Sequence, residues 1–518
     1  MESTKIYFKK RYQDIQTKEI QIEIKSGYRG KETNAVIYRN ELTTSKLHEL
    51  RKIGFPFFTA EESCEIVGDF ADNEAGIPIE LTYKTVGFHE IDGKTYFLHR
   101  KALENGNALP ICYNGDMDLG KKGSFEDNVK FFNDIISKHI GLQTICAVAL
   151  SSAVVGMLTD KDLKFIFHIE GTSTSGKTTS LMLAGSMWGN PKISVNGVVK
   201  NWNTTDNKLI QSAGGNKGIM IGLDELSMSK ADNTLLTYLL TSGADKRRMT
   251  SIEGADSEFR TIFMSTGEIQ FKSSNFGGIG VRLFEVKNYN FTQDKETADI
   301  ITKEIHKNYG YIGFRFAKAL TAYSANNIQD KLETTTEKVI KRIAYHCEQE
   351  GRKISPLFSR IAEKIAAVVI AAKLSKKKLG LNFDINGIVD FLICNTTVLD
   401  IGQEQSVDAM EKFLEEYTKN RVKFPKSNEP MEINIWGKSV FENGELTEIV
   451  VMYNQFVKMM NKIGYPDTIS LIKALKEKGF IKCEDGKNYA RRKIGDNKRA
   501  KAVVIDVFAV KRGDEDEV

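Results

Sequence analysis

The sequence predicts an α/β fold built around a parallel sheet, and three adjacent patterns lead to this prediction. Leu163–Ile169 is an apolar run of the kind that forms a buried strand, and Ser180–Trp188 has the composition of a helix. Between them lies Gly171–Thr178, GTSTSGKT, which matches the pattern G-x-x-x-x-G-K-[ST]. Strand, glycine-rich loop and helix in this order let backbone N–H groups at the helix N-terminus surround phosphates. The alternative is a chance glycine-rich turn, which is expected in roughly 2% of chains of this length.

The loop predicts a site for ATP and Mg²⁺. Lys177 is expected to reach the β- and γ-phosphates, and the Thr178 hydroxyl to ligate Mg²⁺. The residues expected to surround the nucleotide are Gly171, Thr172, Ser173, Thr174, Ser175, Gly176, Lys177, Thr178 and Thr179.

A second apolar run, Gly218–Leu226, ends in two adjacent carboxylates, Asp224 and Glu225. A continuous apolar run is typical of a strand buried on both faces of a parallel sheet, and ligands bind such sheets at the carboxyl ends of the strands. We expect Asp224 to hold Mg²⁺ through water and Glu225 to polarise the water that attacks the γ-phosphate. An ordinary solvated turn is the alternative for the acid pair taken alone.

Length and composition indicate a globular protein of two to four domains. The 518 residues are 41% hydrophobic and 27% charged, and the net charge of +5 is too small to indicate nucleic acid by itself. The distribution of charge is more informative, because residues 481–512 hold ten Lys and Arg against four Asp and Glu.

Six scattered cysteines without metal spacing indicate reduced thiols and a cytoplasmic protein. The longest apolar stretch, Ile145–Leu158, is too short to span a bilayer, so no membrane role is predicted.

Changes of pattern along the chain divide it into three predicted domains. Residues 1–122 alternate β-like runs with turns, which predicts a small, mainly β or α+β domain of unassigned role. Residues 123–420 alternate strands and helices and then become helical over 297–374, which predicts an ATPase core with a helical lid. Residues 421–518 begin with a polar linker and then read helix, helix, β-hairpin, the order of a winged helix, with an acidic tail.

The segment after the acid pair separates a ring motor from other users of phosphate loops. In ring ATPases of the AAA+ class, a polar residue at the end of the next strand senses the γ-phosphate, and an arginine beyond it completes the neighbouring subunit's site. Ser265 or Thr266 is the candidate sensor, and Arg282 is the candidate arginine finger. Arg360, on the expected lid, is a further candidate nucleotide contact. Surface positions without a role are the alternative for both arginines.

Two basic clusters are candidate DNA contacts. Lys246, Arg247 and Arg248 lie where a helicase can insert a loop into its channel, and three adjacent cations grip phosphates without recognising sequence. Arg491, Arg492, Lys493, Lys498 and Arg499 fall on or beside the expected wing. A solvated basic turn and a protein-contact face are the respective alternatives.

The chain resembles a known family through several motifs: HIEGTSTSGKTTSLMLAGSMWGNP at 168–191, WNTT at 202–205, DEL at 224–226 and FMSTGE at 263–268. These are similar to the MCM-like, self-loading helicases and replication initiators of staphylococcal cassette-chromosome and pathogenicity-island elements. The similarity covers about 125–399 and more loosely the C-terminal module. One departure is that Ser265-Thr266 stand where related ATPases have an Asn sensor.

The resemblance implies a hexameric, ATP-dependent DNA helicase and replication initiator of a mobile element. Its partners would be origin duplex and single-stranded DNA, further copies of the chain, and a primase or other replication proteins. Two alternatives stay open: an ATP-switched origin-binding protein that does not unwind DNA, and a packaging or remodelling AAA+ ATPase that acts on protein.

Overall fold

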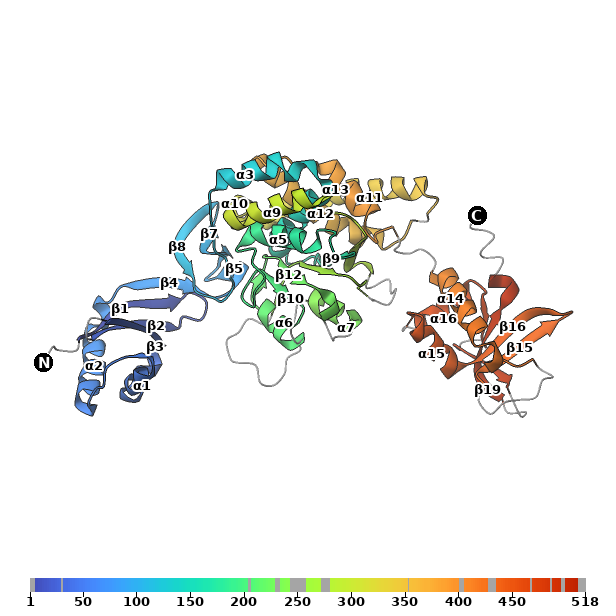
Figure 1. Ribbon diagram of the computed structural model, residues 1–518, viewed down its shortest axis with the longest axis horizontal. Coiled ribbons are helices and arrows are strands. Elements are labelled where there is room, and N and C mark those ends of the chain that lie inside the picture. The colour runs from blue at the N-terminus through green and yellow to red at the C-terminus, as the bar shows by residue number, and fades with distance from the viewer. Residues whose placement is uncertain are drawn as a thin grey trace.

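The computed structural model describes twelve stretches of the chain, and all structural statements below refer to them. They are residues 5–28, 31–203, 206–228, 233–242, 258–271, 280–352, 354–399, 405–426, 435–465, 468–484, 487–494 and 499–510. The described residues form an N-terminal sheet with two helices, a central α/β body and a C-terminal module (Figure 1).

The N-terminal sheet is nine-stranded, in the order β11-β5-β6-β7-β8-β4-β1-β2-β3. The strands are β1 Lys5–Asp14, β2 Ile20–Tyr28, β3 Lys31–Tyr38, β4 Ile79–Tyr83, β5 Val86–Ile91, β6 Lys94–Leu98, β7 Lys101–Glu104, β8 Asn107–Tyr113 and β11 Asn216–Lys217. Helices α1 (Thr44–Glu49) and α2 (Ala60–Asn73) share a hydrophobic core with β2 and β3. A tight hairpin joins β5 to β6 at Asp92-Gly93, where both residues have positive φ and Ile91 pairs with Lys94.

Strands β5 and β6 pack into the central body. Val86, Phe88 and Phe97 belong to the same hydrophobic core as the central helices. At Gly87, with φ of 86°, a Cβ atom would lie 2.0 Å from the carbonyl oxygen of Lys217, so only glycine permits β5 to pair with β11 there. The second half of the predicted 1–122 domain is therefore continuous with the nucleotide-loop body.

The central sheet consists of five strands, all parallel, in the order β10-β12-β13-β9-β14. They are β9 Ile166–Glu170, β10 Val199–Asn201, β12 Ile221–Asp224, β13 Phe263–Gly267 and β14 Leu283–Lys287. Alternate residues of β9 enter different cores: Phe167 and Ile169 pack on one face, and Ile166 on the other. Burial on both faces explains why these strands are mainly apolar, as the sequence predicted.

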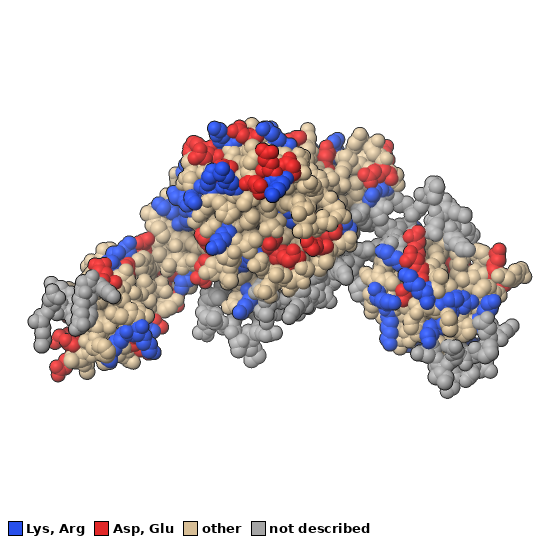
Figure 2. All heavy atoms as spheres, viewed as in Figure 1, with Lys and Arg blue, Asp and Glu red and all other residues tan. Residues whose placement is uncertain are grey.

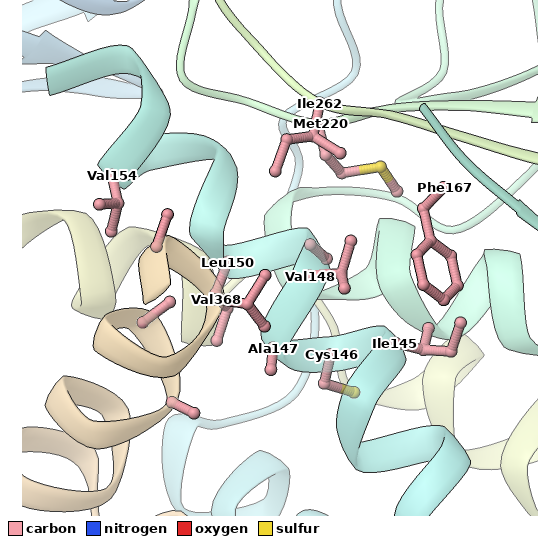
Figure 3. Packing of buried hydrophobic residues seen from close by; sticks show 14 of the residues in the cluster. Ile145, Cys146, Ala147, Val148, Leu150, Val154, Phe167, Met220, Ile262 and Val368 are labelled. Carbon is pink, nitrogen blue, oxygen red and sulfur yellow. The ribbon is translucent and has the colours of Figure 1, made fainter. Parts of the chain in front are cut away.

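Helix α4 (Ile140–Met157) is the centre of the larger core. Its Ile145 and Val148 lie near Phe167 of β9, and its Leu150 lies near Val368 of α12 (Figure 3). By length and composition α4 is apolar enough to cross a membrane, but 89% of that window is buried inside the protein. It is therefore a core helix in this fold.

The remaining central helices form layers on the two faces of the sheet. Helices α6 (Asp206–Ala213) and α7 (Asn233–Ser242) cover the face of Ile166. The other face carries α3 Phe125–Asp134, α5 Lys177–Trp188, α9 Lys295–Lys307, α10 Ile312–Leu320, α11 Ala325–Gln349, α12 Phe358–Leu379 and α13 Ile385–Cys394. The helical block expected to be a lid thus shares one hydrophobic core with the sheet.

The C-terminal module begins with α14 (Gln405–Lys419), whose Phe413 packs against Phe456 of α15. Its antiparallel sheet has the order β15-β16-β19-β17, and β18 also pairs with β19. The elements are β15 Gly437–Glu442, β16 Glu445–Met452, α15 Tyr453–Lys462, α16 Thr468–Glu477, β17 Ile481–Lys482, β18 Ala490–Lys493 and β19 Arg499–Asp506. A hairpin at Asn443-Gly444 joins β15 to β16, and the order of two helices followed by a β-hairpin is as predicted.

Candidate nucleotide site and DNA-binding surface

The glycine-rich loop joins the carboxyl end of β9 to the N-terminus of α5. Gly176 is the N-cap residue, with φ of 76°, and a Cβ atom there would lie 2.6 Å from the Thr292 side chain. Thr174 also has positive φ, at 80°. The tight turn therefore leaves the first N–H groups of α5 facing the loop, at the positive end of the helix.

The Lys177 ammonium group lies inside this loop. Nζ donates to the carbonyl oxygens of Gly171, at 2.6 Å, and Thr172, at 2.7 Å, and only 8% of the residue is exposed. Within the described residues the buried Ser175 hydroxyl has no hydrogen-bond partner. A lysine and a loop hydroxyl gathered at a helix N-terminus can hold phosphate oxygens.

Asp224 connects the loop helix to the neighbouring strand. Its Oδ1 accepts hydrogen bonds from the Thr266 hydroxyl, at 2.6 Å, and from the Thr178 hydroxyl, at 3.1 Å. Thr178, Asp224 and Thr266 lie close together because β9, β12 and β13 are parallel and all end at the same edge of the sheet. Two hydroxyls and a carboxylate are oxygen donors of the kind that Mg²⁺ prefers. The residues present therefore fit a Mg²⁺ site, in which Thr178 could contact the ion directly and Asp224 through water.

Glu225 follows in a backbone conformation that side chains rarely adopt. Its φ is 65°, its N–H donates to the Thr266 hydroxyl at 3.2 Å, and its carboxylate accepts from the Ser227 hydroxyl at 2.5 Å. A left-handed non-glycine residue costs about 1–2 kcal/mol. Such outliers occur where the surroundings hold a functional group in place.

The structure separates the two candidate sensors. Thr266 points to the acid pair, whereas Ser265 points to the opposite face of the sheet. There the Ser265 hydroxyl contacts Trp202 Nε1 at 3.0 Å and His168 Nδ1 at 2.9 Å. Thr266 is thus the residue that shares the edge with Asp224.

Arg282 and Arg360 lie away from the subunit's own loop. Arg282 precedes β14, and its carbonyl accepts from Ile166 N, the first residue of β9, so it sits at the opposite edge of the sheet. Its guanidinium lies 5.4 Å from the Tyr238 ring centre and 3.9 Å from Asp162 Oδ2. Arg360 is exposed one turn before Lys364, which donates to the Asp162 carbonyl, so it belongs to that same side. Neither arginine is brought to the loop within one chain.

The C-terminal basic residues lie on the β18–β19 ribbon. Arg491 stands opposite Lys501, and Lys493 opposite Arg499. These four alternate positions share one face of the ribbon, and Arg492 falls on the other. Directly opposed like charges are destabilising, so this face favours an anionic partner. Figure 2 shows several Lys and Arg side chains close together on the visible face of this module.

Four candidate contacts fall outside the described residues: Lys246, Arg247, Arg248 and Lys498. Sequence reasoning missed His168 and the roles of Trp202 and Thr292. The available signals were a histidine inside an otherwise apolar strand and a tryptophan directly after β10.

Comparisons with known proteins agree with this architecture. Residues 1–257 match the family described as "Domain of unknown function (DUF927)", and residues 405–513 match the "Cch helix turn helix domain". The solved structure of the active helicase Cch of SCCmec type IV superposes with a TM-score of 0.74 at 24% identity, covering 98% of this chain and 94% of that one. The C-terminal region of NrS-1 covers 96% of both chains, but with a TM-score of only 0.27 at 11% identity. No curated protein sequence gives a significant match.

Fold and site define an α/β protein that presents a glycine-rich loop and an acidic strand end at one edge of a parallel sheet. Residues 1–257 thus belong to the DUF927 family, and residues 405–513 to the Cch helix-turn-helix domain family. The family resemblance indicated by the motifs is thereby confirmed. The helix-turn-helix match starts at α14, so this helix belongs with the C-terminal core in both sequence and packing.

Replacing Lys177 by methionine should weaken nucleotide binding while leaving the fold intact, because the ammonium group faces the loop and the methylene stem keeps its volume. We expect the Kd for a fluorescent ATP analogue to rise about tenfold or more, since a hydrogen bond to a charged group contributes about 1.5–3 kcal/mol. Lys287→Met is the matched control, because Lys287 ends β14 at the same sheet edge but outside the loop. Equal affinities in the two variants would contradict the site.

Proposed function

We propose that the protein is an ATP-dependent DNA helicase and replication initiator of a mobile genetic element, acting in the cytoplasm. One observation carries the proposal: Asp224 Oδ1 is shared by the hydroxyls of the loop residue Thr178 and the strand residue Thr266. An acid in this position, beside a phosphate loop, can report the state of the γ-phosphate to two elements at once. The likeness to the active helicase Cch supports the same conclusion at the level of the fold.

Hydrolysis follows from the positions of the chain's own groups. Lys177 and the N–H groups of α5 would hold the phosphates, and Thr178 with Asp224 would hold Mg²⁺, which offsets charge on the β- and γ-phosphates. The Glu225 carboxylate would orient the attacking water and accept its proton as the water oxygen bonds to the γ-phosphorus and ADP leaves. Thr266 would align both acids, since it bonds Asp224 Oδ1 and the Glu225 N–H.

Assembly into a ring, with a hexamer as the proposed state, would complete each site. Arg282 precedes β14, at the sheet edge opposite its own loop, and in the proposed ring it would reach the nucleotide of a neighbouring subunit. An arginine supplied in this way stabilises the charge of the transition state and makes hydrolysis depend on assembly. We assign Arg360 to the same intersubunit side. The architecture is then an AAA+ core, spanning about 123 to 404, in which α9–α13 take the place of the lid.

DNA would be bound by the C-terminal module, beginning at residue 405, as a winged helix. The β18–β19 ribbon would be the wing on the backbone, and α16, with exposed Lys473 and Lys476, would enter the major groove. Lys246, Arg247 and Arg248 remain the proposed channel contacts to single-stranded DNA. A primase or another replication protein remains a proposed partner.

The alternative function is an ATP-switched origin-binding protein, which the basic ribbon would also serve. Unwinding of a forked duplex by the full-length chain separates the two functions. We expect ATP-dependent unwinding by the wild type and none by Glu225→Gln, because this variant keeps nucleotide binding but loses the base that activates water. Tight duplex binding without strand separation by the wild type would establish the alternative instead.

The ribbon predicts a change in the salt dependence of duplex binding. Arg491→Ala combined with Lys493→Ala should lower the slope of log K against log salt by about two, because each phosphate contact contributes about 0.9. The control is Lys412→Ala with Lys419→Ala, which removes the same charge from α14 of the same module. Equal slopes in the two double variants would show that the ribbon does not contact phosphates.

A further inference from the structure

A buried chain of hydrogen bonds crosses the central sheet on the face away from the phosphate loop. Trp202 Nε1 contacts the Ser265 hydroxyl at 3.0 Å, and this hydroxyl contacts His168 Nδ1 at 2.9 Å. His168 Nε2 in turn lies 3.1 Å from the carbonyl oxygen of Ile269. None of the three side chains belongs to a residue that is more than 2% exposed.

Chemistry assigns each proton in this chain. A carbonyl oxygen can only accept, so His168 Nε2 carries a hydrogen and donates to Ile269. Burial lowers the pKa of His168 to about 4, so the ring is neutral and Nδ1 accepts. Ser265 therefore donates to His168 and accepts from the Trp202 indole, which can only donate. The Ser265 hydroxyl thus donates one hydrogen bond and accepts another, and the three side chains contact each other directly.

Both ends of this hydrogen-bond network contact the backbone near the sheet edge that carries the phosphate loop. The backbone N–H of Trp202 donates to the Asp224 carbonyl at 2.9 Å. Ser265 is the immediate neighbour of Thr266, the residue that bonds Asp224 Oδ1. Ile269 lies just beyond the end of β13 at Gly267. The Phe271 ring packs against both His168 and Trp202, at interplanar angles of 75° and 62°, and so contacts both rings of the network.

We propose that Trp202, Ser265 and His168 form a relay of positioning residues for ATP hydrolysis. The relay fixes the position of β13 relative to its neighbours β9 and β12. This position brings the Thr266 hydroxyl within hydrogen-bond distance of Asp224. It also ties the segment after β13 to that position, because His168 holds the Ile269 carbonyl. This inference rests on the proposed function and assigns a role to Trp202, the first residue of the WNTT motif.

The physical basis is the cost of an incomplete buried network. Removing the Ser265 hydroxyl leaves an indole N–H and an imidazole nitrogen without partners in the sheet, and a low-dielectric surrounding makes that costly. Strand β13 can relieve the cost only by moving, and movement changes the distance between Thr266 and Asp224. A network that served stability alone would lower the unfolding free energy without selecting the chemical step.

The test compares Ser265→Ala with Ser152→Ala in the full-length protein. Ser152 is the matched control, because its hydroxyl is also fully buried, and donates to the carbonyl oxygens of Ala149 and Gly218 away from the nucleotide edge. We expect both variants to unfold at similarly lowered urea concentrations. Only Ser265→Ala should lose kcat for ATP hydrolysis, by about tenfold or more, with its Kd for a fluorescent ATP analogue within about twofold of wild type.

A second variant protects the test against misfolding. Trp202→Phe keeps an aromatic ring against Phe271 but removes the indole N–H, and should lower kcat in the same direction. The double variant should lose no more than the more severe single variant, because both changes act through one hydroxyl. Fully additive losses, or a Ser265→Ala kcat within twofold of Ser152→Ala, would overturn the relay. Absence of hydrolysis by the wild type would instead overturn the proposed function, and the relay with it.

Discussion

The parallel alignment of five short strands is the constraint on which the rest of the structure depends. Because β9, β12 and β13 run in the same direction, the phosphate loop, Asp224 and Thr266 all emerge at one edge. The same alignment leaves Arg282 at the start of β14, on the opposite edge. A parallel sheet is stable only when both faces are covered, so this geometry also requires the helical layers around it.

The coverage explains features that have no chemical role of their own. Helix α4 is apolar on all sides because it packs between the sheet and α12. The N-terminal strands β5 and β6 bury Phe88 and Phe97 in the same core, and β5 pairs with β11 just before β12. A displacement of the strand that carries Asp224 would therefore meet resistance from the N-terminal sheet as well as from the helices.

Sequence alone predicted the loop, the acid pair and most elements, because these depend on local pattern. The glycines and Lys177 have fixed spacing, and apolar runs mark buried strands. The choice between Ser265 and Thr266 could not be made, since it depends on which face of β13 each side chain occupies. His168 went unnoticed because its partners lie about a hundred residues away, on Ser265 and Ile269. The lid was expected from helical periodicity, which does not tell whether a helix packs into the core.

The central claim is that the two edges of this sheet are the two halves of one hydrolysis site, shared between neighbouring subunits. The most direct measurement is ATP hydrolysis by mixtures of Lys177→Met and Arg282→Ala chains. Each variant alone should be inactive, and the mixture should recover activity where an intact loop faces an intact arginine. Full activity of Arg282→Ala alone, or no recovery in a mixture shown to co-assemble, would contradict the account.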